Sequence, residues 1–222
     1  MDNKYYYTYE TTKDYCYKGT TVLINKLNVF NNEVLYDAER ALVTLRIYEF
    51  NEKPIKGNFD FTHLKNIHKF LFQDIYRWAG DIRNCNIAKQ DLFCLKENIE
   101  TFSKDIFAQV EKENYYINYD FDKKINKLVE LFADINALHP FREGNGRVQR
   151  IFIEMLAKSI GVYLDLTTVK KEDMIIASHE SINGNYEKLL NIFKNNSYIL
   201  TEKERKIYVN IYCSERIIKK LM

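Results

Sequence analysis

The scarcity of helix-breaking residues limits what this chain can fold into more than any other feature of its sequence. Only 2 of the 222 residues are proline and 7 are glycine, so few positions interrupt a regular helix. Apolar residues recur three and four positions apart over residues 31–50, 60–79, 96–113 and 120–138, which is the period of one helix face. We therefore predict an all-α fold.

No repeat, low-complexity tract or flexible linker divides the chain, which favours one domain over residues 1–222. We expect an irregular N-terminal arm over residues 1–16, a core over 17–195 and a helical extension of unknown role over 196–222. Within the core we expect a short helix at 22–27 and further helices at 168–177 and 185–195. Residues 81–95 alternate apolar and polar residues and form the one candidate β-hairpin.

Charge and cysteine content exclude several classes of function. The formal net charge is +2, which gives no global attraction to nucleic acid or to an anionic membrane. The four cysteines are widely spaced, without a CxxC pair, and fit neither a disulfide framework nor a zinc site. No apolar run is long enough to span a bilayer. We expect a cytoplasmic protein that binds neither nucleic acid nor membrane.

Residues 139–150, HPFREGNGRVQR, concentrate polar chemistry in a loop between two predicted helices. Gly144, Asn145 and Gly146 lead into the second helix, whose first N–H groups and positive dipole end favour a phosphate. Arg147 and Arg150 lie three apart and project from one face of that helix towards the same ligand. The loop is therefore predicted to bind a polyphosphate.

Three further residues of this loop have separate predicted roles. Glu143 would repel a phosphate unless a divalent cation lies between them, which points to Mg²⁺. His139 titrates near neutrality and suits the removal of a proton from a hydroxyl. Phe141, an aromatic residue in a polar loop, is expected to pack into the core as an anchor. Two histidines lie upstream. We expect His63 at the surface and His68 to be a packed or hydrogen-bonded residue of a helix.

The stretch resembles the Fic family signature, His-Pro-Phe-x-(Asp/Glu)-Gly-Asn-Gly-Arg-x-x-Arg, with every specified position filled. Residues 17–20, 25–27 and 72–80 are also similar to Fic sequences, so the resemblance covers roughly residues 17–195. It implies a Fic-type helical bundle around a central motif helix, with a small β-hairpin flap. Walker A and HExxH patterns do not fit this stretch.

The resemblance implies a protein adenylyltransferase, which moves AMP from ATP to a Ser, Thr or Tyr hydroxyl of a target protein. His139 would be the general base, Glu143 the Mg²⁺ ligand, residues 144–146 the anion hole, and Arg147 and Arg150 the β- and γ-phosphate ligands. The family's flap would pair with an extended target segment through Ile87, Ala88, Lys89, Gln90, Asp91, Leu92 and Phe93.

The resemblance leaves other activities open. The kinase-like branch typified by Doc has lysine at the position of Gly146, and other Fic proteins transfer UMP or phosphocholine. A Fic fold kept as an inactive interaction module is a further alternative. Glycine at position 146 favours transfer of AMP.

Many Fic proteins carry an inhibitory Ser/Thr-x-x-x-Glu-Gly/Asn helix whose glutamate pairs with the second arginine of the signature, here Arg150. The one related stretch, from Thr168 to Glu172, is followed by Asp173 and is better explained as a helix N-cap with first-turn acids. We expect no inhibitory helix in this chain. A small antitoxin would then supply the glutamate, which makes the chain the toxin of a toxin–antitoxin pair.

Overall fold

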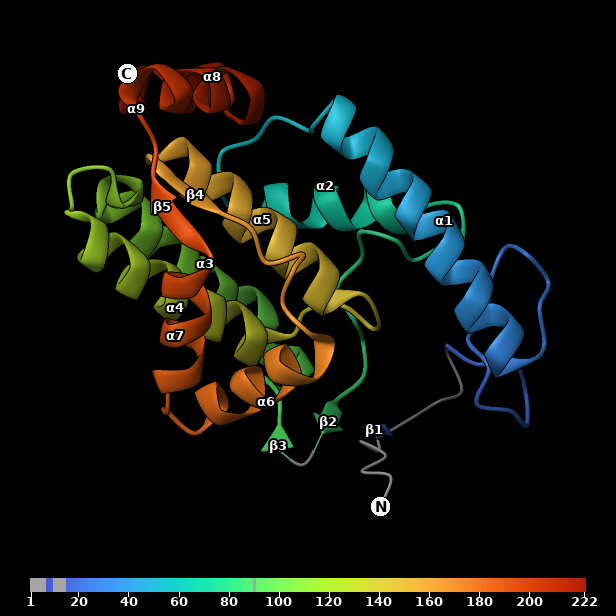
Figure 1. The fold of residues 1–222 in the computed structure, drawn as a ribbon. Coiled ribbons are helices and arrows are strands. Elements are labelled where there is room, and N and C mark those ends of the chain that lie inside the picture. Colours follow the sequence, from blue (N-terminus) through green and yellow to red (C-terminus); the bar gives the residue numbers. More distant parts are fainter. Residues whose placement is uncertain (1–6, 10–14, 90) are drawn as a thin grey trace.

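Helix α5 (Asn145–Ser159) runs through the middle of the helical bundle in the computed structural model (Figure 1). Its first turn belongs to the stretch 139–150, which we call the glycine-rich loop. The structure describes residues 7–9, 15–89 and 91–222. Val148, Phe152 and Leu156 of α5 are fully buried. The helix packs against α2 (Phe61–Phe72), α4 (Phe121–Leu138), β4 (Val162–Leu164) and α8 (Glu202–Tyr212). The predicted helical bundle around the motif helix is confirmed.

Two N-terminal helices, α1 (Asn32–Glu52) and α2 (Phe61–Phe72), lie on one side of α5 (Figure 1). Each begins where a side chain accepts from the first-turn N–H groups: Asn31 caps α1 and Asp60 caps α2. The buried face of α1 carries one carboxylate, Glu39, among apolar residues.

The 3₁₀ turn η1 (Lys96–Asn98), α3 (Ile99–Lys112) and η2 (Asn114–Tyr116) lead into α4 (Phe121–Leu138). Helix α4 is capped by Asp120, whose side chain accepts from the Lys123 N–H, and packs along α5. It ends at Leu138, because Pro140 disfavours helical geometry at the residue before it, His139. The last turn of α4 therefore leads directly into the glycine-rich loop.

The C-terminal part belongs to the same bundle. Strands β4 and β5 pair antiparallel, with Val162 opposite Ile199, and α8 packs on α5. The 196–222 extension therefore closes the side of the bundle opposite the flap (Figure 1). After α5, the elements follow in the order β4 (Val162–Leu164), α6 (Lys171–Ile182), α7 (Glu187–Asn195), β5 (Ser197–Ile199), α8 (Glu202–Tyr212) and α9 (Glu215–Leu221), and the last three form the extension.

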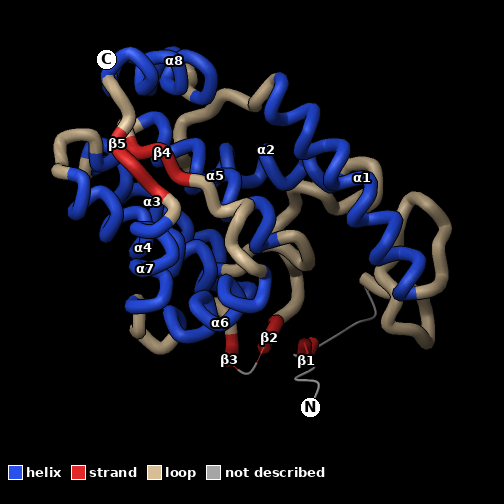
Figure 2. Tube along the Cα trace, viewed as in Figure 1, coloured by secondary structure: helices blue, strands red, loops and turns tan. Residues whose placement is uncertain are grey.

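The predicted hairpin is confirmed as strands β2 (Ile87–Lys89) and β3 (Asp91–Leu92), and Gln90 at its turn lies outside the described residues (Figure 2). A third strand, β1 (Tyr7–Tyr9), adds antiparallel to β2, with Thr8 opposite Ala88. The N-terminal arm, expected to be irregular, therefore contributes a strand to the flap.

Two predicted helices differ from the structure. Residues 22–27 form a loop, because the Asn25 side chain bonds to the carbonyls of Leu23 and Val29 and replaces helical hydrogen bonds. Helix α2 ends at Phe72 and not at residue 79. The carbonyls of Gln73 and Ile75 instead accept hydrogen bonds from the Lys26 side chain and backbone.

The helices of the described ranges contain no segment with the length and hydropathy needed to cross a bilayer.

Candidate active site

His139 stands at the C-terminus of α4 in the left-handed conformation, with φ 42° and ψ 58°. Its backbone N–H still donates to the Ile135 carbonyl, at 3.1 Å, so the residue turns the chain out of the helix without losing contact with it. The imidazole is 7% exposed and stacks on the Phe93 ring of the flap, with centroids 3.8 Å apart and planes at 14°. The flap thus packs directly on the predicted base.

Arg83 ties the flap to this histidine. Its side chain is 2% exposed and donates to the carbonyl of His139 (2.7 Å), to Cys85 at the start of the flap (2.6 Å) and to Cys94 at its end. Burial lowers its pKa below the usual value for arginine. Sequence reasoning missed this residue, since neither spacing nor composition distinguishes a buried arginine from a surface one.

The loop between α4 and α5 is braced by the side chain of Asn145. Its Oδ1 accepts from the N–H of Phe141 at 2.9 Å, and its Nδ2 donates to the Phe141 carbonyl at 2.7 Å. Phe141 is 1% exposed and stacks on the His68 ring, 3.9 Å between centroids. The side chain of Asn145 therefore closes the loop, and we assign ligand binding to its backbone N–H.

Gly144 begins α5 in the left-handed conformation, with φ 84°. The first hydrogen bond of the helix runs from the Val148 N–H to the Gly144 carbonyl, at 3.2 Å. By helix geometry the N–H groups of Asn145, Gly146 and Arg147 precede that bond and point out of the helix end. Gly146 is exposed, so this end of the helix is open to an anion.

Glu143 and Arg147 face each other across the helix start. The Glu143 Oε1 accepts from the Gly144 N–H at 2.9 Å and from Arg147 Nη2 at 3.3 Å. The Glu143 side chain is 31% exposed. Arg147 also pairs with Glu39 of α1 and lies over the Phe72 ring, 4.7 Å from its centroid. Burial opposes its charge, but the two carboxylates outweigh burial and raise the pKa of Arg147.

Arg150 lies beside the same helix start, since a Cβ on Gly146 would be 3.4 Å from its Nη1. Burial and the neighbouring charge of Arg147 lower the pKa of Arg150. Within the described part of the chain, no carboxylate forms an ion pair with it. The structure therefore brings together the two arginines, Glu143 and the helix start, as the sequence predicted.

A Mg²⁺ ion beside Glu143 would need phosphate oxygens as further ligands. The described ranges contain no group of three or more His, Cys, Asp or Glu side chains able to hold a metal ion. Mg²⁺ is usually bound by one or two carboxylates together with phosphate oxygens and water. Glu143, partly exposed at the rim of an anion site, meets that requirement once a phosphate is present.

The predicted flap residues divide between two faces. Ile87 and Phe93 are buried beneath the flap, against Tyr15 and Cys85, whereas Leu92 is 58% exposed. Only the backbone of Lys89 and Asp91 is described. Strand β1 pairs with the outer edge of β2, so β1 and β3 are the two edge strands of this sheet among the described residues.

His68 is a second residue whose importance the sequence did not show. We expected a packed or hydrogen-bonded histidine, and its Nδ1 accepts from the Gly80 N–H (2.8 Å) while Nε2 bonds to the Glu143 carbonyl (3.0 Å). Burial lowers its pKa to about 3, so the ring is neutral and bonds as a fixed tautomer. The surface position expected for His63 is wrong, because it is 2% exposed and bonds to the Ile55 carbonyl.

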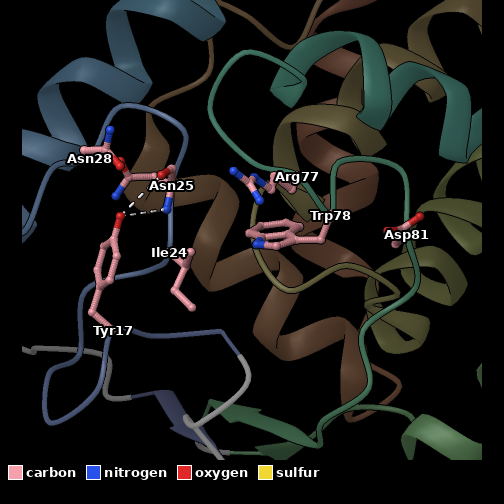
Figure 3. A pocket seen from close by; sticks show the side chains of 7 residues that line it. All are labelled: Tyr17, Ile24, Asn25, Asn28, Arg77, Trp78 and Asp81. Carbon is pink, nitrogen blue, oxygen red and sulfur yellow. Dashed lines mark hydrogen bonds between the residues drawn. The ribbon is translucent and has the colours of Figure 1, made fainter.

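A surface cavity of about 470 Å³ lies apart from the glycine-rich loop, and none of residues 139–150 lines it (Figure 3). The loop containing Tyr17 and Asn25 forms one wall, and Arg77, Trp78 and Asp81 form the other. The polar groups of Asn25 are already hydrogen-bonded within its loop.

Comparison with known proteins agrees with this geometry. The Fic/DOC family model matches residues 58–157. The chain is 34% identical to the probable protein adenylyltransferase y4lH of Sinorhizobium fredii, over 76% of this chain and 88% of that one. It is 35% identical to the protein adenylyltransferase VbhT of Bartonella schoenbuchensis over 95% of this chain, but it spans only 44% of the length of VbhT.

Solved structures show the same fold. The BepC protein of Bartonella tribocorum with bound AMPPNP has a TM-score of 0.78 and 26% identity, over 85% of this chain and 98% of that one. The N-terminal Fic domain of a Bartonella quintana cell filamentation protein with bound ADP has a TM-score of 0.79, also at 26% identity, over 86% and 97%. The chain belongs to the Fic/DOC family.

Proposed function

We propose that this chain is a protein adenylyltransferase that transfers AMP from ATP to a Ser, Thr or Tyr hydroxyl of a target protein. The observation that carries the proposal is the pairing of a flap-covered histidine with an open helix start. His139 is stacked under Phe93, and the N–H groups of residues 145–147 lie at the other end of the same loop. Relatives named as adenylyltransferases, at 33–35% identity, support it.

In the proposed reaction the target hydroxyl oxygen attacks the α-phosphorus of ATP, and His139 takes the hydroxyl proton. The new O–P bond forms as the bond between the α-phosphorus and the bridging oxygen breaks, and pyrophosphate leaves. Because Nδ1 of His139 is buried, we assign the proton transfer to Nε2. The stack on Phe93 and the carbonyl bond from Arg83 hold the ring in place.

The phosphates of ATP are proposed to bind at the start of α5. Backbone N–H groups of residues 145–147 would donate to them, and Arg147 and Arg150 would neutralise their charge. Mg²⁺, when bound at Glu143, would offset charge on the phosphates and the leaving pyrophosphate. The AMPPNP and ADP bound to the two similar structures support an adenine nucleotide as the ligand.

Gly146 favours adenylylation over phosphorylation. A side chain at this position would start 3.4 Å from the Arg150 guanidinium, and a lysine there would add positive charge where Arg150 is to meet the γ-phosphate. A Doc-like kinase and transfer of UMP or phosphocholine are therefore the less favoured alternatives. An inactive interaction module would not need the polar loop that His68 and Asn145 brace.

The test uses ATP labelled in either the α- or the γ-phosphate, with Mg²⁺ and a candidate target. Adenylylation labels protein from the α-position alone, and His139→Ala abolishes that label while the variant keeps the wild-type melting temperature. Label from the γ-position would show a kinase, and unlabelled protein under both conditions, with the chain itself also unmodified, would favour the interaction module.

We further propose that regulation comes from a separate small protein, an antitoxin that supplies a glutamate to Arg150. Arg150 has no ion pair within the described residues. Glu172 is exposed in the first turn of α6, and the expected Thr168 cap is wrong, since Lys170 precedes that helix and Thr168 bonds to Asn196. Robust self-labelling by the isolated chain supports the proposal. Silence that Glu172→Gln relieves would contradict it.

A target is proposed to dock on the flap as an added strand. Main-chain pairing of this kind needs an edge with unpaired N–H and C=O groups. Strand β3 is the edge strand that belongs to the predicted flap residues, because β1 already pairs with the outer edge of β2 and forms the other edge of the sheet. A Pro substitution at Leu92 is expected to lower target labelling more than nucleotide binding.

A further inference from the structure

Glu39 of helix α1 is the one carboxylate outside the glycine-rich loop that forms an ion pair with Arg147 in the described part of the chain. We infer that Glu39 is a positioning residue: it holds the Arg147 guanidinium in place, so that Glu143 is released to hold the cation of a bound nucleotide. This inference rests on the proposed binding of ATP and Mg²⁺ at the start of α5.

The contact joins two elements that are far apart in the sequence. Oε1 of Glu39 accepts from Arg147 Nη2 at 2.7 Å, and Oε2 accepts from the Tyr76 hydroxyl. Glu39 is only 7% exposed and lies on the buried face of α1 between Leu35 and Val43. A charged side chain in such a place needs compensating partners. Both of its oxygens have one.

Tyr76 acts as a donor to Glu39. Its pKa is raised, first by burial and then by the Glu39 charge, so the phenol keeps its proton. It therefore fixes the direction of the carboxylate towards Arg147, and its ring stacks on Trp78, 4.2 Å between centroids. The position of Glu39 is set by packing on α2 and its following turn and does not depend on a ligand.

Two carboxylates compete for one nitrogen of Arg147. Glu39 is 2.7 Å from Nη2, and Glu143 is 3.3 Å from it. The Glu39 side chain is 10% exposed and the Glu143 side chain 31% exposed. Electrostatic attraction is stronger at the shorter distance and where the pair is less exposed to solvent. Glu39 is therefore the firmer partner, and Glu143 the one that can move to a cation.

The remaining donors of Arg147 face no such competition. Both carboxylates use Nη2, so Nη1 and Nε of the guanidinium are left for a phosphate within the described part of the chain. The Phe72 ring supports the guanidinium plane from one side, 4.7 Å from its centroid. An arginine fixed by a carboxylate and an aromatic ring loses less freedom when it binds phosphate.

Removal of the Glu39 charge has a specific consequence. Arg147 would then keep Glu143 as its only carboxylate partner among the described residues, and this ion pair would compete with Mg²⁺ for Glu143. Glu39→Gln is therefore expected to weaken binding of the Mg²⁺–nucleotide complex, most strongly where Mg²⁺ is limiting. A residue that only stabilised the fold would show no such dependence on Mg²⁺.

The experiment measures AMPPNP binding by calorimetry over a range of Mg²⁺ concentrations, with thermal melting of each variant. We expect Glu39→Gln to lower the affinity about tenfold, the loss of one charge-assisted contact, and to raise the Mg²⁺ concentration needed for half-maximal binding. Glu49→Gln is the matched control, because Glu49 also pairs with an arginine on α1, Arg46, which Asp74 holds in addition. It should bind as the wild type does.

A double-mutant cycle separates positioning from general stability. If Glu39 acts through Arg147, then Glu39→Gln has no further effect on binding in an Arg147→Ala background. Additive effects would overturn the inference, as would unchanged or tighter binding by Glu39→Gln. Tyr76→Phe, which removes only the hydroxyl bond to Glu39, should shift binding in the same direction and decides the question if Glu39→Gln does not fold. Absence of binding by the wild-type chain would instead refute the proposed function.

Discussion

Substitution of Gly144 by alanine should damage the loop twice, through its backbone and through its contact with the core. Gly144 has φ 84°, where a Cβ is strained. A Cβ built there would overlap the Cζ and Cε2 atoms of Phe72 and would lie 3.1 Å from Cε1. Phe72 is fully buried, so its ring cannot move without disturbing the packing of α2 against α5.

The two costs can be estimated separately. The left-handed conformation costs about 1–2 kcal/mol for a residue with a Cβ. Overpacking of a buried site costs about 1–3 kcal/mol. Their sum is about 2–5 kcal/mol of unfolding free energy. A chain of this size loses about 2–4 °C of melting temperature per kcal/mol, so Gly144→Ala should melt on the order of 10 °C below the wild type.

Gly184→Ala is the matched control. Gly184 has φ 80°, and a Cβ there would meet no atom within 4 Å. It therefore carries the strain alone, about 1–2 kcal/mol, and should melt only a few degrees lower than the wild type. Calorimetric melting of the three proteins checks this. Equal shifts for the two variants would refute the claim that Phe72 enforces glycine at position 144.

Three other predictions concern the residues around the loop. His68 has a pKa of about 3 in the folded chain and about 6.5 in the unfolded chain, so the unfolded chain binds more protons below pH 6.5. Lowering the pH from 7 to 5 should therefore reduce the unfolding free energy by about 2 kcal/mol, and His68→Gln should remove that share of the pH dependence. Arg83→Lys should lower stability by about 2–4 kcal/mol, because an ammonium cannot serve the carbonyls that the guanidinium joins, whereas the exposed Arg77→Lys should leave melting unchanged. Phe93→Leu should leave nucleotide affinity intact but slow AMP transfer about tenfold, since a misplaced His139 loses its alignment; an unaltered transfer rate would show that the stack does not orient the base.

The sequence predicted the parts of the fold that follow local rules. Helical periodicity located α1, α4 and α5, because the spacing of apolar residues within a segment follows the buried face of its helix. The loop at 22–27 was predicted as a helix because its residues have a composition typical of one. In the structure, hydrogen bonds between the Asn25 side chain and the backbone of Leu23 and Val29 form the loop instead.

The candidate site divides in the same way. The residues of the glycine-rich loop are contiguous, so their chemistry could be read from spacing. Glu39, Arg83 and His68 reach the loop from elements more than 50 residues away in the sequence. Their contacts depend on how α1, α2 and the flap pack around α5, and no local pattern in one sequence carries that information.

In the proposed function, His139 faces the α-phosphate of ATP. A crystal structure of this chain with AMPPNP and Mg²⁺ would locate each phosphate. We expect the α-phosphate beside His139, the β- and γ-phosphates at the N–H groups of residues 145–147 with Arg150, and Mg²⁺ at Glu143. A γ-phosphate beside His139, or a nucleotide bound in the cavity at Trp78, would contradict this expectation.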